Sequence, residues 1–175
     1  MKINKHILST IKKDFIFLTG EINIDKDYFI SKIEKGIKEK NNLNHRTNVS
    51  GYMTDWNYFN NDSEFTRILV RIMNYIEKHS VIDRKVKLEN VWGIKENFSD
   101  RTKLHDHAKC ILSGVIYLST VDQKLIFPQI KQEVSSKEGN VVIFSGFLEH
   151  GTNERILEDK SKYALAFNLI EHIDF

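Results

Sequence analysis

The sequence predicts an α+β protein in which helices from the first half of the chain pack on a β-sandwich or barrel from the second half. Apolar residues recur at helical spacing in residues 27–40 and again after Asp62. From residue 85 onward this periodicity gives way to short runs of β-branched and aromatic residues separated by turns. Several short strands at this spacing are typical of a sandwich or barrel and argue against a parallel sheet with helical crossovers.

The first half of the chain predicts one strand, two helices and a loop. Residues 14–24 alternate loosely between apolar and polar, which favours an opening strand. Residues 41–57 are polar and rich in Asn, so we expect a loop there with a turn at Gly51. The second helix begins at a cap formed by Asp62 or Ser63. Its apolar stripe predicts a core-facing helix: Phe65, Ile68, Leu69, Ile72, Met73 and Ile76.

The second half predicts only strands, and the sequence shows no internal repeat and no linker. We therefore expect a single domain over residues 1–175, with a helical and mixed part over about 1–84 and a β-core over about 85–175. Pro128 follows one of the apolar runs and ends it. The expected strands are residues 87–94, 103–107, 111–119, 123–127, 140–147 and 162–171.

Composition excludes several classes of protein. With 41% hydrophobic residues in 175, the chain can bury a substantial core. Lys and Arg number 26 against 24 Asp and Glu, and no basic stripe carries interleaved aromatics, so a nucleic-acid partner is not supported. No apolar run approaches the about 20 residues that a membrane helix needs. Cys110 is the one cysteine, which excludes an internal disulfide and favours a reducing cytoplasm.

Three histidines are candidate metal ligands: His105 and His107 in LHDH, and His150 in FLEHG. In a strand, residues two apart share a face, so His105 and His107 would point together while Asp106 points away. Two such imidazoles can chelate one divalent metal. His150 lies 43 residues after His107, and a barrel can bring it opposite the pair. A single H-x-H pair is common by chance, so three unrelated histidines remain the alternative.

The surroundings of these histidines resemble the double-stranded β-helix oxygenases that use iron(II) and 2-oxoglutarate. The similar segments are HDHAKCILSGVIYLST, EGNVVIFSGFLEHGTNE and KYALAFNL, preceded by NVSGYMTDW and VWGIKENFSDRTKLHDH. They keep the family's order over about residues 45–172 and are most similar to a small prolyl-hydroxylase-like group found in phages and bacteria. The resemblance implies a jelly-roll core with the N-terminal helices packed on one sheet. It also implies Fe(II), 2-oxoglutarate and O2 as cofactors.

The resemblance further implies a reaction and a ligand set. The enzyme would hydroxylate an unactivated carbon of a peptide, prolyl or small-molecule substrate and release succinate and CO2. His105 and His150 match the first and distal metal ligands. The second ligand falls on His107, where the family carries a carboxylate, and a third neutral imidazole leaves the metal site one unit more positive. A bulged strand could instead present Asp106. We favour His107 because it requires no bulge.

The resemblance also places the cosubstrate. Lys162, 12 residues after His150, stands where the family commonly has arginine and would bind the distal carboxylate without a bidentate fork. Tyr117 matches the tyrosine that bonds the cosubstrate carboxylate. Ser113, on the same strand face as Tyr117, and Asn168, on the face of Lys162, are further cofactor-binding candidates. Arg155 is a second candidate cation.

Two other functions remain open at this point. Three histidines with one open position also suit a hydrolytic zinc site. A non-catalytic β-barrel module, such as a phage accessory or structural protein, could retain the motif without turnover. The polar loop over residues 41–61 could cover the pocket as a lid, but we favour packing of its aromatics in the core: Tyr52, Trp56, Tyr58 and Phe59. The substrate and the oligomeric state do not follow from the sequence.

Overall fold

A computed structural model describes residues 14–39, 48–79, 81–157 and 159–172. Strands β1, β7, β4, β9, β3 and β2 form one sheet in that order, and β6, β5 and β8 form a smaller one. Every pairing is antiparallel. The elements are β1 Phe17–Glu21, α1 Lys26–Glu39, β2 Tyr52–Met53, α2 Ser63–Lys78, β3 Val86–Glu96, β4 Leu112–Tyr117, β5 Lys124–Phe127, β6 Gln132–Ser135, β7 Asn140–Ser145, β8 Gly151–Thr152 and β9 Lys162–Glu171.

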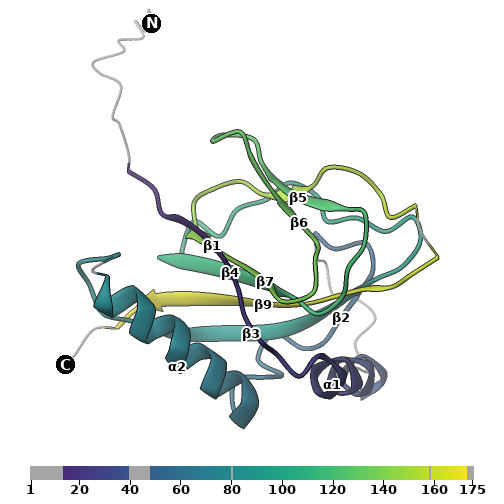
Figure 1. The fold of residues 1–175 in the computed structure, drawn as a ribbon, viewed down its shortest axis with the longest axis horizontal. Coiled ribbons are helices and arrows are strands. Elements are labelled where there is room, and N and C mark those ends of the chain that lie inside the picture. The colour runs from purple at the N-terminus through teal and green to yellow at the C-terminus, as the bar shows by residue number, and fades with distance from the viewer. Residues whose placement is uncertain (1–13, 40–47, 80, 158, 173–175) are drawn as a thin grey trace, which may run out of the picture.

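Both helices lie on one side of the six-stranded sheet, while β5 and β6 lie on the other (Figure 1). The large sheet is therefore covered on both faces. The two helices expected from periodicity are present, and five of the expected strands correspond to β3, β4, β5, β7 and β9. The predicted α+β fold with a jelly-roll β-core is confirmed.

Asp62 begins α2 and also joins the two helices. Its side chain accepts a hydrogen bond from the Phe65 N–H at 2.9 Å, which satisfies one of the unpaired donors of the first turn. The same carboxylate accepts from Tyr28 Oη at 2.8 Å and from Lys32 Nζ at 2.5 Å, both on α1. Since Asp62 is buried, one side chain fixes the start of α2 and its position against α1.

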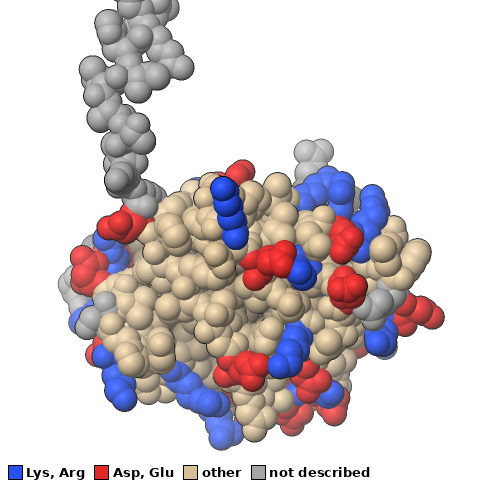
Figure 2. Space-filling view, turned by 45° about the horizontal axis from the view of Figure 1, so that its top comes forward, with Lys and Arg blue, Asp and Glu red and all other residues tan. Residues whose placement is uncertain are grey.

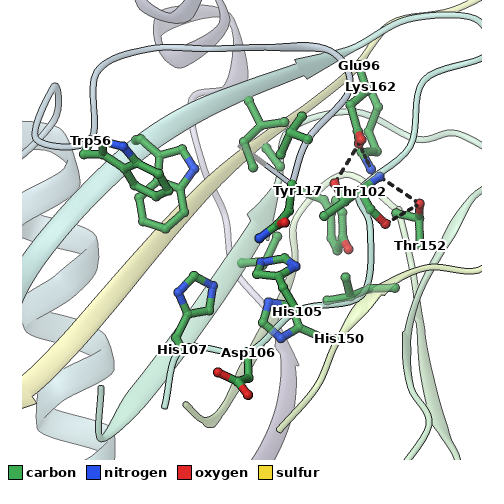
Figure 3. A pocket seen from close by; sticks show the side chains of 17 residues that line it. Trp56, Glu96, Thr102, His105, Asp106, His107, Tyr117, His150, Thr152 and Lys162 are labelled. Atoms are coloured by element: carbon green, nitrogen blue, oxygen red, sulfur yellow. Dashed lines mark hydrogen bonds and ion pairs between the residues drawn. The ribbon is translucent and has the colours of Figure 1, made fainter. Parts of the chain in front are cut away.

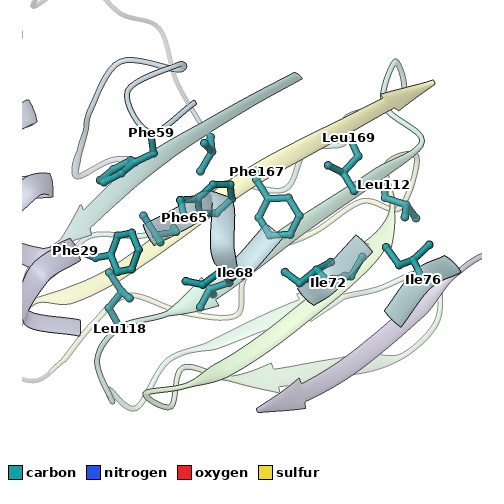
Figure 4. Packing of buried hydrophobic residues seen from close by; sticks show 14 of the residues in the cluster. Phe29, Phe59, Phe65, Ile68, Ile72, Ile76, Leu112, Leu118, Phe167 and Leu169 are labelled. Carbon is teal, nitrogen blue, oxygen red and sulfur yellow. The ribbon is translucent and has the colours of Figure 1, made fainter. Parts of the chain in front are cut away.

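The core between helices and sheet uses the apolar stripe that predicted α2. Phe65 of α2 lies edge-on to Phe167 of β9, with ring centroids 5.8 Å apart (Figure 4). Full burial of such a side chain stabilises the fold by about 1.5–3 kcal/mol. The same cluster contains residues of both helices, of the turn before α2 and of the central strands: Phe29, Ile33, Phe59, Ile68, Ile72, Ile76, Leu112, Ile116, Leu165 and Leu169.

Alternation along β9 assigns its residues to two different environments. Leu165, Phe167 and Leu169 pack toward the helices, whereas Ala164 and Ala166 lie on the opposite face. β9 pairs with β3 on one edge and with β4 on the other. The small residues of β9 therefore leave room on the face that looks toward the small sheet, as the sequence predicted.

Three features of the β-core differ from the sequence-based expectation. Residues 103–107 form no strand. Their β-type backbone pairing is the isolated antiparallel bridge between His105 and His150. β6 occurs where no strand was expected, because this exposed segment has one buried apolar residue, Val134, and so carries no clear alternation. β2 and β8 have two residues each, which is too short for a periodic signal. The first part of the proposed lid, residues 41–47, lies outside the described residues.

The surface carries charges of both signs. On the face drawn in Figure 2, basic and acidic side chains lie interspersed around uncharged areas, and neither sign forms a continuous field. Among the described segments, no helix is long and apolar enough to cross a membrane.

We expect Gly93→Ala to lower the free energy of unfolding by about 1–3 kcal/mol, since a Cβ there would lie 2.3 Å from Ile33 Cγ1 on α1. In an Ile33→Ala background the same change should cost less, because the obstructing atoms are gone. Gly20→Ala is the control, since its Cβ would meet Val141 Cγ1 at 3.7 Å. Denaturant unfolding measures all three. Equal stability of the Gly93 and Gly20 variants would contradict the close packing of α1 on β3.

Candidate active site

Three imidazoles converge between the two sheets. One ligand atom from each of His105, His107 and His150 lies within 4.8 Å of the other two. The ring centroid of His105 lies 4.4 Å from that of His150 and 5.0 Å from that of His107. Figure 3 shows the three rings together. His150 is buried, and the other two are half-buried. The structure therefore brings together the three histidines that the sequence singled out.

Main-chain hydrogen bonds hold this arrangement without a regular strand. His105 and His150 exchange two of them, at 3.0 and 2.9 Å. The His107 N–H donates to the Gly146 carbonyl at 2.7 Å, and the His107 carbonyl accepts from the Cys110 N–H at 2.7 Å. At Gly146 a Cβ would lie 2.6 Å from the His107 carbonyl oxygen and 2.4 Å from that of Cys110. The approach of these two segments therefore requires glycine at position 146.

Two of the rings are oriented by the backbone two residues before them. His105 Nδ1 lies 2.8 Å from the Lys103 carbonyl oxygen, and His150 Nδ1 lies 2.9 Å from that of Leu148. A carbonyl only accepts, so each Nδ1 carries the proton and each Nε2 keeps its lone pair. This is the arrangement that metal-binding histidines use to fix ring and tautomer.

Burial keeps all three imidazoles neutral near pH 7. Burial, together with the nearby His105, lowers the pKa of His107 to about 4 and that of His150 to about 3. The pKa of His105 is also lowered, mainly by burial. Neutral imidazole is the form that donates a lone pair to a metal.

Asp106 lies beside the cluster and outside it. Its side chain is exposed, and its Oδ1 accepts from the Ala108 N–H at 3.2 Å. In the described part of the chain, the group of residues placed to share one ion consists of the three histidines. The geometry therefore favours His107 over Asp106, although His107 precedes a turn and lies outside any strand.

A cavity of about 340 Å³ extends from the histidines across the large sheet. Its floor consists of alternate residues of three adjacent strands, which share a face because side chains alternate along a strand. Trp56 also lines this cavity (Figure 3), with its ring centroid 4.5 Å from that of Trp92. The floor residues are Trp92, Ile94 and Glu96 of β3, Val115 and Tyr117 of β4, and Lys162 and Ala164 of β9.

A buried ion pair closes the end of the cavity farther from the histidines. Lys162 is 4% exposed and forms an ion pair with Glu96, which is fully buried. Lys162 Nζ also donates to Gln123 Oε1 at 2.5 Å, and Thr102 Oγ1 donates to Glu96 Oε1 at 2.9 Å. Tyr117 lies between this pair and the histidines (Figure 3). Burial raises its pKa, and the Glu96 carboxylate adds to the effect, so its hydroxyl stays protonated.

Sequence reasoning missed Glu96, Thr102 and Gln123. Glu96 stands directly opposite Lys162 in the register of β3 and β9. The available signal in the sequence was therefore a carboxylate at the end of the strand that contains Trp92. Finding it required the pairing of two segments more than sixty residues apart. Nothing in the local sequence marks Thr102 or Gln123.

Two of the predicted cosubstrate residues do not line this cavity. Ser113 Oγ donates to Asn168 Oδ1 at 2.7 Å, and Asn168 Nδ2 donates to Asn90 Oδ1 at 2.9 Å. Both lie on the expected face, but toward the opposite ends of β4 and β9 from Tyr117 and Lys162. A strand advances about 3.3 Å per residue, so a shared face does not imply a shared site. The structure therefore places Ser113 and Asn168 outside the cavity that Tyr117 and Lys162 line.

The other residues considered in the sequence differ in whether they line the cavity. Arg155 donates to the Ser99 carbonyl at 2.7 Å and does not line the cavity. Cys110 is half-buried, and burial with the nearby Glu89 raises its pKa to about 12, so it stays a thiol. Of the aromatics in the proposed lid, Phe59 is fully buried in the core and Trp56 lines the cavity.

The fold is similar to that of solved 2-oxoglutarate-dependent enzymes, which confirms the expected resemblance at the level of the fold. No family model and no curated protein matches the sequence. The chain is similar to the viral collagen prolyl hydroxylase of Paramecium bursaria Chlorella virus-1 in its 2-oxoglutarate complex, at 14% identity and a TM-score of 0.69, over 92% of this chain and 97% of that one.

Two further solved enzymes show the same fold. HygX from Streptomyces hygroscopicus, with nickel and 2-oxoglutarate bound, matches at 14% identity and a TM-score of 0.59, over 89% of this chain and 81% of that one. The α-ketoglutarate-dependent carbocyclase SnoK from nogalamycin biosynthesis matches at 10% identity and a TM-score of 0.66, over 87% of this chain and 78% of that one.

We expect Gly146→Ala to weaken metal binding by about tenfold or more, because its Cβ would push the His107–Cys110 turn away from His150. Calorimetric titration of the apoprotein with Co(II) measures the affinity. Gly20→Ala is the control for the substitution itself, and circular dichroism of the metal-free proteins checks the fold. Unchanged affinity would show that the cluster does not depend on this close approach.

Proposed function

We propose that this chain is an Fe(II)- and 2-oxoglutarate-dependent oxygenase that hydroxylates an unactivated carbon of a peptide, prolyl or small-molecule substrate. The observation that carries the proposal is a cavity with a neutral three-histidine cluster near one end and a buried lysine at the other. A 2-oxo acid that chelates a metal at the histidines would extend toward that lysine. A volume of about 340 Å³ lies in the range of small-ligand pockets.

The residues present fit these groups. His105, His107 and His150 would hold the metal through three neutral nitrogens and leave positions open for cosubstrate and O2. Tyr117 would donate its hydroxyl, and Lys162 an N–H, to the cosubstrate carboxylates. When bound, Fe(II) and 2-oxoglutarate supply the oxidising chemistry, in which O2 is consumed and succinate and CO2 are released.

The chain's own contribution is to bind, orient and exclude water. Trp92, Val115 and Leu125 give the cavity apolar walls, which strengthen the polar contacts inside it. Trp56 adds an aromatic surface on which a substrate can pack. With one cysteine in the chain, we expect the reaction in a reducing compartment such as the cytoplasm.

A hydrolytic zinc site is the second candidate, because the group of possible ligands contains three histidines and no carboxylate. Three imidazoles and a water suit tetrahedral zinc. The two candidates differ in whether a 2-oxo acid binds to the metal-loaded protein. A non-catalytic module would show no turnover in either case.

The deciding experiment is an anaerobic titration of the apoprotein with Fe(II) and then with 2-oxoglutarate, following the visible metal-to-ligand charge-transfer band. We expect a band in the wild type, none in His150→Ala, and about tenfold or greater loss of 2-oxoglutarate affinity in Lys162→Ala. Absence of the band together with tight zinc binding would eliminate the oxygenase and favour the zinc site.

A matched pair of variants tests the second ligand. His107→Ala should lose about tenfold or more in Fe(II) affinity, because it removes one of three donors. Asp106→Ala should change the affinity by no more than about fivefold, since its carboxylate is exposed and bonded to the Ala108 N–H. His79→Ala, at an exposed histidine at the end of α2, is the control. The reverse order of effects would assign the ligand to Asp106.

A further inference from the structure

The cation at the far end of the cavity already has a counter-ion within the protein. Lys162 forms an ion pair with Glu96, and both side chains are almost completely buried. Both residues line the cavity, so no other residue separates either charge from it. A distal carboxylate that reached Lys162 would therefore also meet the carboxylate of Glu96.

The surrounding hydrogen bonds fix this pair in place. Thr102 donates to Glu96 Oε1, and Gln123 accepts from Lys162. The amide of Gln123 is itself held, because its Nε2 donates to the backbone carbonyls of Asp100 and Glu154 at 3.2 and 2.8 Å. The ammonium thus cannot swing away from Glu96 without breaking a bonded network.

The donors of Lys162 define what the far end can still bind. An ammonium has three N–H donors, and within the described residues two of them meet Glu96 and Gln123. One donor remains for a ligand, while the positive charge is compensated. One hydrogen bond suits an uncharged group, whereas a carboxylate gains most from an uncompensated cation.

The placement of charge differs from that of a site with a carboxylate metal ligand. Here the three candidate ligands are imidazoles, which bind a metal as uncharged donors, and the acidic group lies beside the lysine. The total charge of the site is the same as in a site where a carboxylate binds the metal and the distal cation has no counter-ion. Its distribution favours the anionic end of a 2-oxo acid at the metal and disfavours a second anion at the far end.

We propose that Glu96 determines cosubstrate specificity, so that the cavity binds 2-oxo monocarboxylic acids with an uncharged distal end at least as readily as 2-oxoglutarate. This inference rests on the proposed function, since it concerns the same cavity. Glu96 acts through Lys162 and is a positioning residue as well as a source of charge. Its replacement by Gln keeps the size and one acceptor oxygen but removes the charge.

The test compares 2-oxoglutarate with 2-oxopentanoate, in which a methyl group replaces the distal carboxylate. Both are titrated anaerobically into Fe(II)-loaded wild type and Glu96→Gln, with affinities from calorimetry and the charge-transfer band. We expect wild type to bind the two within about tenfold of each other. In Glu96→Gln, 2-oxoglutarate should bind about tenfold more tightly, while 2-oxopentanoate changes little.

Two further variants separate charge from structure. Glu138→Gln removes an exposed carboxylate paired with Lys26 and should leave both affinities unchanged. The double variant Glu96→Gln/Lys162→Gln removes both charges, and its preference between the two acids should return toward that of wild type. Thermal unfolding and Fe(II) affinity of each variant report whether the fold and the metal site persist.

The outcomes are distinguishable. If neither acid binds the Fe(II)-loaded wild type, the proposed function fails and this inference fails with it. If both bind but Glu96→Gln changes the two affinities by the same factor, Glu96 has only a structural role and the inference alone fails. A wild type that binds 2-oxoglutarate more than about tenfold more tightly than 2-oxopentanoate would likewise overturn it.

Discussion

Burial of the large sheet on both faces is the constraint on which the rest of this molecule depends. β9 lies between β3 and β4, so each of its residues must fit either the helix-side core or the cavity side. Leu165 and Phe167 fill the first, and their neighbours Ala164 and Ala166 leave space in the second. The cavity exists because the small residues of the central strand lie opposite a second sheet that cannot collapse onto them.

The histidine cluster depends on backbone geometry more than on strand periodicity. His105 is joined to His150 by an isolated bridge, and His107 is held through the carbonyl of Gly146. Carbonyls also orient two of the rings, so the donor nitrogens are aimed before any ligand arrives. Such pre-orientation lowers the entropic cost of binding an ion. Burial also prepares the cluster for an ion, because the imidazoles stay neutral without a metal.

Stability alone does not account for the buried Glu96–Lys162 pair. Removing two charges from water is costly, and well-packed apolar residues of similar size often stabilise a fold as much or more. Here the pair lines the cavity, and Thr102 and Gln123 each form one hydrogen bond with it. Its position beside the proposed cosubstrate explains the pair better than its contribution to folding does.

The sequence by itself determined what depends on neighbouring residues. The stripe from Phe65 to Ile76 predicted α2, Asp62 or Ser63 was expected as its cap, and alternation from Lys162 to Leu169 predicted the two faces of β9. Spacing and resemblance together selected the three histidines.

Only the tertiary structure decided which residues share a site. It paired Glu96 with Lys162 and moved Ser113 and Asn168 away from the cavity. It also brought His107 to His150 from an irregular segment where a strand was expected. The physical reason is that periodicity fixes the side of a sheet on which a residue lies, whereas its partner depends on strand order and register, which are set by contacts between distant segments.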